Sequence, residues 1–159
     1  QVRGIRLRAP DGYKYALRGG RQGLFVPEGL ADSGPVFVAE GPTDTAALLD
    51  LGFEAIGRPS CGSGAALVTA WVRRHCRQEV VVVSDGDGPG QRGADALAKM
   101  LVAYCAAVRG LAPPEGVKDM RDWKRAGATP AEVLQAVERA PRYRVRIRCT
   151  GGRGGAGHA

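Results

Sequence analysis

Residues 80–94, VVVVSDGDGPGQRGA, decide the fold, because a run of four valines leads into two aspartates and then into a helix that opens with glycine. A continuous apolar run of this length, bounded by Ser84 and glycines, is typical of a buried parallel strand. In open α/β sheets, ligands bind at the carboxyl ends of such strands. The stretch therefore predicts a parallel sheet with Asp85 and Asp87 at its ligand-binding edge.

The two aspartates have two interpretations. With only Gly86 between them, Asp85 and Asp87 can turn toward one point, where two carboxylates repel unless a cation lies between them. Magnesium is the cation that best suits such hard oxygen ligands. The alternative is a surface turn whose acids cap the following helix.

Strands and helices alternate through most of the chain. Short apolar strands are expected at residues 35–39, 54–57, 80–83 and 106–109. Helices are expected at residues 43–51, 65–76, 90–106, 119–126 and 130–138. This alternation implies an α/β domain, a parallel sheet flanked by helices, which we place at residues 31–140. A terminal strand within residues 141–149 and a disordered, glycine-rich tail at residues 150–159 should follow it.

The first thirty residues predict a small basic antiparallel region instead. Alternating side chains indicate strands at residues 5–8, 13–17 and 23–26, joined by turns at Asp11-Gly12 and Gly19-Gly20. One face of these strands should pack, and the other should present arginine and lysine.

The net charge of +7 is concentrated at the two ends of the chain. Residues 1–30 hold six basic and two acidic side chains, and six arginines with no acid follow Glu138. Basic segments on both sides of an acidic, potentially metal-binding central segment suit the binding of a phosphate backbone. The alternative is that these exposed arginines only keep the chain soluble.

Cysteine usage and hydropathy limit the other classes of protein. Four scattered cysteines, no Cys-x-x-Cys pair and only two histidines argue against a zinc site. Thiols used in this way indicate a reducing compartment, and we expect a cytoplasmic protein. No apolar run reaches the length of a membrane span, and the amino terminus lacks the form of a signal peptide. Because the first residue is not methionine, we expect a piece of a longer polypeptide.

Four motifs lie in order along about eighty residues of the chain. They are Glu40-Gly-Pro-Thr-Asp44, Gly52-Phe-Glu-Ala-Ile-Gly57 with Ser60-Cys-Gly-Ser63, Asp85-Gly-Asp-Gly-Pro-Gly90, and Pro114-Glu-Gly-Val-Lys-Asp119. Together they resemble the Toprim domain, which bacterial-type primases, topoisomerases, OLD-type nucleases and recombination mediator proteins share. The second and fourth motifs are most similar to the DnaG-type primases of bacteria, phages and plasmids.

The resemblance implies a Rossmann-like Toprim fold and metal-dependent nucleotidyl transfer, the synthesis of RNA primers on single-stranded DNA. Asp85 and Asp87 would bind Mg²⁺ or Mn²⁺, and Glu40 would be a further ligand or the general base. The remaining implied residues are Asp44 and Asp119 for a second metal, Lys118, Gly62 and Ser63 for the nucleotide, and Lys14, Arg18 and Arg21 for the template. The implied partners are single-stranded DNA, ribonucleoside triphosphates and a replicative helicase, with no membrane.

Two other functions remain open at this point. An OLD-like nuclease would use the same carboxylates with water as the nucleophile, and a non-catalytic Toprim module would bind nucleic acid without turnover.

The chain also lacks the zinc ribbon and most of the polymerase subdomain of a whole primase. We therefore expect primer synthesis only when these domains are supplied.

Overall fold

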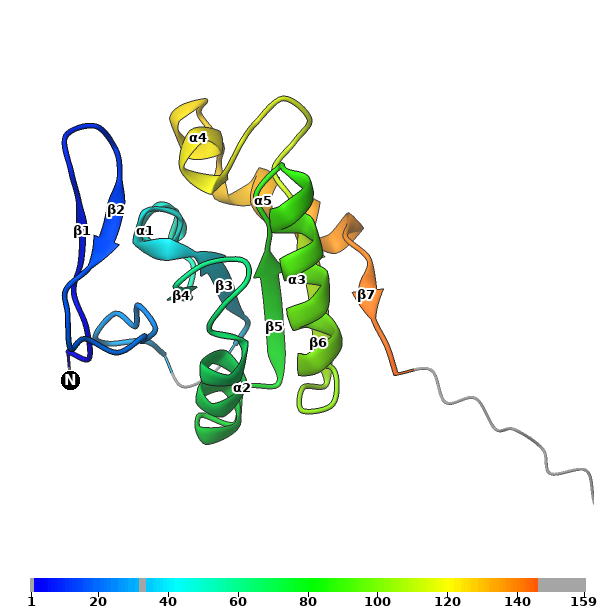
Figure 1. The fold of residues 1–159 in the computed structure, drawn as a ribbon. Helices are drawn as coiled ribbons and strands as arrows, with labels where there is room; N and C mark the ends of the chain where they lie inside the picture. Colours follow the sequence, from blue (N-terminus) through cyan, green and yellow to red (C-terminus); the bar gives the residue numbers. More distant parts are fainter. Residues whose placement is uncertain (1, 32–33, 146–159) are drawn as a thin grey trace, which may run out of the picture.

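The computed structural model describes residues 2–31 and 34–145, and a mixed β-sheet forms the centre of the fold (Figure 1). Its strands are β3 (Val36–Glu40), β4 (Ala55–Arg58), β5 (Glu79–Val83), β6 (Ala107–Leu111) and β7 (Arg142–Tyr143). Their spatial order is β4-β3-β5-β6-β7, in which the first four are parallel and β7 is antiparallel to β6. The predicted parallel α/β sheet is confirmed.

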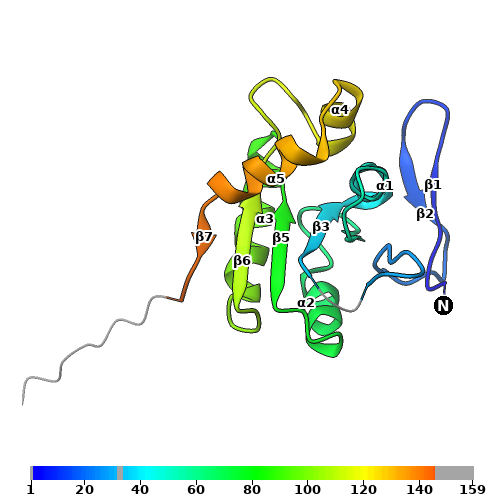
Figure 2. The ribbon, with the colours of Figure 1, turned by 180° about the vertical axis from the view of Figure 1, so that it is seen from behind.

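Helices cover both faces of this sheet, as the two opposite views show (Figures 1 and 2). The helices are α1 (Gly41–Asp50), α2 (Ala65–Arg74), α3 (Gly88–Leu101), α4 (Met120–Arg125) and α5 (Pro130–Arg139). Side chains of α2 and α3 belong to one apolar core, and side chains of α1, α4 and α5 belong to the other. Within the described residues, no helix is both long enough and apolar enough to cross a membrane.

The valine run forms β5 and is buried on both faces. Val80 and Val82 pack into the core under α2 and α3, while Val81 and Val83 pack into the core under α1, α4 and α5. A fully buried valine stabilises a fold by roughly 1.5 kcal/mol or more. The continuous apolar run thus reflects a strand with no solvated face.

The order of the strands reverses between β3 and β5. The chain leaves β3 through α1 to reach β4 on one side, and it leaves β5 through α3 to reach β6 on the other. In α/β proteins the carboxyl ends of the strands at such a switch point are where ligands bind, and we call this region of the molecule the crevice. Glu40 ends β3, and Asp85 follows β5 by two residues.

The amino-terminal strands β1 (Arg6–Arg8) and β2 (Lys14–Ala16) pair as a separate antiparallel hairpin. The prediction that one face of the hairpin packs is wrong, because the cross-strand partners Leu7 and Tyr15 are both exposed. A ribbon of two strands has no second layer to cover either face. The hairpin meets the main domain where Arg6 Nη1 donates a 2.8 Å hydrogen bond to the Pro59 carbonyl oxygen.

Several predicted boundaries also differ from the structure. The strand expected at residues 23–26 is a single bridge between Phe25 and Gly57. Helix α3 ends at Leu101 and not at residue 106, because the chain turns there, with the N–H groups of Tyr104 and Cys105 donating to the Leu101 carbonyl oxygen. Strand β6 consequently begins at residue 107 and continues to residue 111. Within the described residues, the strand predicted within 141–149 is Arg142–Tyr143, and the rest of it and the glycine-rich tail, residues 146–159, lie outside the described residues.

Candidate active site

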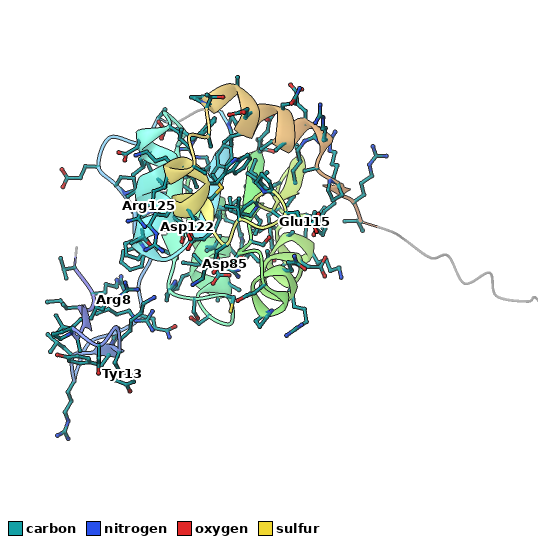
Figure 3. The ribbon with its side chains drawn as sticks, turned by 90° about the horizontal axis from the view of Figure 1, so that it is seen from above. Arg8, Tyr13, Asp85, Glu115, Asp122 and Arg125 are labelled. Atoms are coloured by element: carbon teal, nitrogen blue, oxygen red, sulfur yellow. The ribbon has the colours of Figure 1, made fainter. Side chains whose placement is uncertain are left out.

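Carboxylates from three segments of the chain meet at the carboxyl edge of the sheet. Figure 3 looks down on this edge, with Asp85 near its middle and Asp122 on α4. The charges of Asp87 and Asp119 both act on Asp85, and the charge of Asp85 acts in turn on Glu40 and Asp44. The five acids predicted from the sequence are therefore close enough for the charge of one to change the pKa of another. They are Glu40, Asp44, Asp85, Asp87 and Asp119.

The turn between β5 and α3 is shaped by the helix start that follows it. Asp87 caps α3, because its Oδ1 accepts a 2.7 Å hydrogen bond from the Gly90 N–H. Any Cβ at position 90 would lie 2.9 Å from both the Asp85 Cβ and the Asp87 Oδ1. Only glycine allows this close approach, so position 90 in the first turn of α3 has to be glycine if both aspartates are to keep their places.

A second contact brings the segment before α4 to the same turn. The Gly86 N–H donates a 2.7 Å hydrogen bond to the Lys118 carbonyl oxygen. A Cβ at position 86 would come within 2.8 Å of the Val117 carbonyl oxygen. The glycine between the two aspartates thus lets Lys118 and Asp119 reach Asp85.

Asp44 and Asp119 are buried and already hold partners within the protein. Asp119 caps α4 by accepting a 2.8 Å bond from the Asp122 N–H, and its other oxygen lies 3.4 Å from Arg121 Nη2. Asp44 Oδ1 accepts a 3.0 Å bond from the Arg121 N–H. Arg121 therefore connects α1 to α4, a role that no local sequence signal indicated.

Glu40 forms an ion pair with a buried arginine. Arg58 Nη2 lies 3.1 Å from Glu40 Oε1, and the arginine side chain is only 1% exposed. This arginine ends β4 beside Glu40 in the neighbouring strand, and no local sequence signal indicated the ion pair. Recognising it requires the strand register, which the sequence pattern does not contain.

Burial and mutual repulsion make three of the carboxyl groups harder to ionise. Burial raises the pKa of Asp44 to about 6, with the charges of Asp119 and Asp85 adding to the effect. Burial likewise raises the pKa of Glu40, although the nearby Arg58 opposes the shift. The pKa of Asp85 is raised by burial and then by the charges of Asp119 and Asp87. The crevice therefore holds more negative charge than its cations balance.

The carboxylates share a crevice without converging on one point. Among residues 2–31 and 34–145, no three acidic, histidine or cysteine side chains stand close enough together to hold a metal ion. The excess negative charge and hard oxygen atoms nonetheless suit a divalent cation such as Mg²⁺.

The predicted nucleotide-binding residues flank the crevice. Lys118 is exposed, and its positive charge partly opposes the rise in the pKa of Asp85. Gly62 and Ser63 lie in the loop between β4 and α2, where the hydroxyls of Ser60 and Ser63 are 2.7 Å apart. Nothing lies within 4 Å of the position that a Cβ of Gly62 would occupy. The backbone of this loop is thus open to a ligand.

The predicted template residues belong to the hairpin region and not to the crevice. Lys14, Arg18 and Arg21 are all exposed. Figure 3 places their neighbours Arg8 and Tyr13 to one side of the main domain. The structure therefore separates a basic region from an acidic crevice.

Replacing Asp44 with asparagine should stabilise the metal-free protein at pH 8. Burial raises the Asp44 pKa from 3.8 to about 6, so the folded state holds this proton more tightly than the unfolded state. The associated stabilisation is complete below pH 4 and is lost as the pH rises through 6. The asparagine side chain keeps the oxygen that accepts from Arg121 but carries no charge.

Urea unfolding with a chelator present should show a gain for Asp44→Asn of up to about 3 kcal/mol at pH 8 and little difference at pH 4. Asp50→Asn, at an exposed aspartate of the same helix, is the matched control. Equal effects of Asp44→Asn at the two pH values would contradict the assigned electrostatics.

The sequence matches no protein-family model and no curated protein, but solved structures share its fold. A DNA primase domain from Pseudomonas aeruginosa is 23% identical, with a TM-score of 0.57 over 70% of this chain and 35% of that chain. A primase domain of bacteriophage T7 is 18% identical, with a TM-score of 0.67 over 88% of this chain and 72% of that chain. The zinc-binding and RNA polymerase domains of the Aquifex aeolicus primase are 16% identical, with a TM-score of 0.65 over 90% and 38% of the two chains.

Identities at this level establish a shared fold. The chain spans about a third of the length of the cellular primase structures, 35% of the Pseudomonas domain and 36% of a DnaG catalytic core. The parallel sheet of these structures is the architecture that the motifs of the chain predict. The chain therefore has a Toprim-like α/β fold, which it shares with about a third of the DnaG-type primase catalytic core.

Proposed function

We propose that this chain is the catalytic core of a primase, which joins ribonucleotides on single-stranded DNA with the help of Mg²⁺ or Mn²⁺. The observation that supports it best is the acidic crevice at the β3–β5 switch point, where Glu40, Asp44 and Asp85 all have raised pKa values. The fold shared with primase cores makes phosphoryl transfer the chemistry that this crevice fits.

Asp85 and Asp87 would bind the cation. They lie in one turn after β5, where the charge of Asp87 raises the pKa of Asp85, and this repulsion falls when a positive charge lies between them. When bound, such a cation holds the phosphates of a nucleotide and stabilises the charge on the departing pyrophosphate. Glu40 would be either a further ligand or the base that accepts the proton of the primer 3′-hydroxyl. Asp44 and Asp119 would support a second, weaker metal site.

The triphosphate would lie between Lys118 and the loop that carries Gly62 and Ser63. Lys118 is exposed beside the aspartates, so its ammonium group can pair with a phosphate. The open space beside Gly62 would allow a phosphate to approach the backbone at this residue. These groups distinguish the site from one that holds only water.

The hairpin would bind the template, with Lys14, Arg18 and Arg21 contacting phosphates. A related DnaG catalytic domain has been solved with single-stranded DNA, and the T7 primase domain with an RNA/DNA hybrid. We infer the same class of partner for this chain, and we extend the proposal to a replicative helicase in a cytoplasmic replication module of a phage or plasmid.

Replacing Lys14, Arg18 and Arg21 with alanine should weaken binding of single-stranded DNA and flatten its salt dependence. A DNA phosphate that the protein no longer contacts keeps its counterion. The slope of log affinity against log salt should therefore become shallower by about 0.7 for each contact that is lost. Fluorescence anisotropy with a labelled oligonucleotide at several salt concentrations measures both quantities.

The matched control replaces Arg73, Arg74 and Lys99, which are also exposed but lie outside the hairpin and the arginine-rich end of the chain. It changes the net charge by the same amount. If the two triple variants behaved alike, the hairpin would be only a solvated basic surface.

Incorporation of labelled ribonucleotides on a single-stranded template tests the proposed reaction. Metal-dependent cleavage of the template without incorporation would instead support a nuclease that uses the same carboxylates.

A further inference from the structure

We propose that Arg58 is a positioning residue, whose buried guanidinium group holds the Glu40 carboxylate, the loop after β4 and helix α3 in one fixed arrangement. The importance of Glu40 rests on the function proposed above. The contacts of Arg58 do not depend on that function, so the two ideas can fail separately.

The sheet register brings the two residues together. Arg58 ends β4, Glu40 ends β3, and they are direct partners across the parallel pair. Partners in register project their side chains from the same face of a sheet. The guanidinium of Arg58 thus lies beside the Glu40 carboxylate at the rim of the crevice, 3.1 Å from Oε1.

Arg58 also bonds to two further segments, its own loop and a helix distant in the sequence. Its Nη1 donates to the Cys61 carbonyl oxygen at 3.0 Å and to the Gly93 carbonyl oxygen at 3.1 Å. A Cβ at position 93 would lie 2.5 Å from that same Cys61 oxygen. Helix α3 and the loop therefore touch directly, and the guanidinium group joins both to β3.

Arginine is the residue type that this arrangement needs. Its planar group offers several fixed donors, whereas lysine offers one nitrogen atom that cannot serve three separated acceptors equally well. A buried charge also requires a partner. Within the described part of the chain, Glu40 is the acid that forms an ion pair with Arg58.

Arg58 must act through its neighbours. At 1% exposure its side chain cannot touch a nucleotide. It instead sets the position of Glu40 and of the loop that carries Gly62 and Ser63. Its loss should release both the carboxylate and the loop without changing the residues that line the crevice.

The thiol of Cys61 reports on the loop directly. In Arg58→Lys, alkylation of Cys61, followed by peptide mass spectrometry, should become several-fold faster, because the loop opens locally. The buried thiol of Cys105 should stay protected and show that the fold persists. Arg74→Lys, at an exposed site on α2, is the matched control. A Cys61 rate equal to that of the control would overturn the proposal.

The affinity for Mn²⁺, measured by electron paramagnetic resonance, tests the coupling to Glu40. Arg58→Lys should weaken Mn²⁺ binding by about tenfold or more, as the loss of a supporting partner does at other metal sites. In a Glu40→Gln background the same change should have little further effect. Equal effects in both backgrounds would show that Arg58 does not act through Glu40.

Two outcomes separate this proposal from the proposed function. If the unaltered chain binds no Mn²⁺, the metal-dependent function fails, and Cys61 alkylation alone decides the role of Arg58. If Arg58→Lys exposes Cys105 and so proves unfolded, the Glu40→Gln/Arg58→Met variant replaces it, because removing both charges leaves neither one unpaired. Fast alkylation of Cys61 in that variant supports the proposal, and a rate equal to that of the unaltered chain contradicts it.

Discussion

The Asp85→Asn/Asp87→Asn double variant should lose Mn²⁺ binding while it keeps its fold. Asparagine retains the shape of aspartate and is a good helix cap, so the new side chain at position 87 can still accept from the Gly90 N–H. The variant lacks the two charges that would bind the cation. We expect its affinity, measured by calorimetry, to fall by about a hundredfold or more, since the loss of supporting partners alone costs about 10- to 100-fold.

The matched control for this variant is Asp50→Asn/Asp95→Asn, which removes two aspartates outside the crevice, each paired with a surface lysine. The control should bind Mn²⁺ like the unaltered chain. In the absence of metal the crevice variant should be at least as stable as the control, because two of the mutually repelling charges have gone. An unchanged affinity in the crevice variant would remove Asp85 and Asp87 from the proposed site.

The strand, turn and helix around Asp85 were predictable because their causes are local. The valines make a strand that is buried on both faces, and Gly90 leaves room for the two aspartates. Glu40 and Asp85 each lie at or just after the carboxyl end of a parallel strand. Parallel strands bring their carboxyl ends to one edge whatever their register, so the prediction did not require the register.

The role of Arg58 could not be predicted, because it depends on contacts between distant segments. The register of β4 on β3 and the approach of α3 at Gly93 bury Arg58 beside Glu40. Its Nη1 donates to the backbone carbonyl oxygens of Cys61 and Gly93. Every residue has such a carbonyl group, so the side chains of the sequence do not indicate these two contacts.

Two further predictions, the end of helix α3 and the packed face of the hairpin, were wrong because a sequence pattern does not show how segments pack together. The helix expected to reach residue 106 ends at Leu101, although Val102 and Cys105 continue an apolar pattern. The pattern persists because Cys105 is still buried after the chain has turned. The hairpin was expected to pack one face, but alternation predicts only which side chains share a face and not what covers them.

Glu40→Gln should abolish incorporation of ribonucleotides. Glutamine has nearly the same shape, but it cannot accept a proton and carries no charge to hold a cation. Loss of a general base lowers a rate by about 10²- to 10⁴-fold, which would bring primer synthesis below detection. Initial rates of labelled ribonucleotide incorporation measure the effect, with Glu138→Gln on the exposed end of α5 as the control.

Mn²⁺ affinity then separates the two roles considered for Glu40. If Glu40 is a metal ligand, Glu40→Gln should lower both the affinity for Mn²⁺ and the rate of incorporation. If Glu40 is the general base, the substitution should lower the rate alone. Incorporation at the rate of the control would exclude both roles.

The most direct test of the central claim follows nucleotides and template together in one reaction. The chain is combined with the zinc-ribbon domain and the remaining polymerase subdomain of a DnaG-type primase, labelled ribonucleoside triphosphates and end-labelled single-stranded DNA. With Mg²⁺ or Mn²⁺ we expect short RNA products on an intact template, and none with Glu40→Gln or with a chelator. Metal-dependent cleavage of the template with no RNA product, under conditions in which a complete primase is active, would contradict the assignment and identify a nuclease.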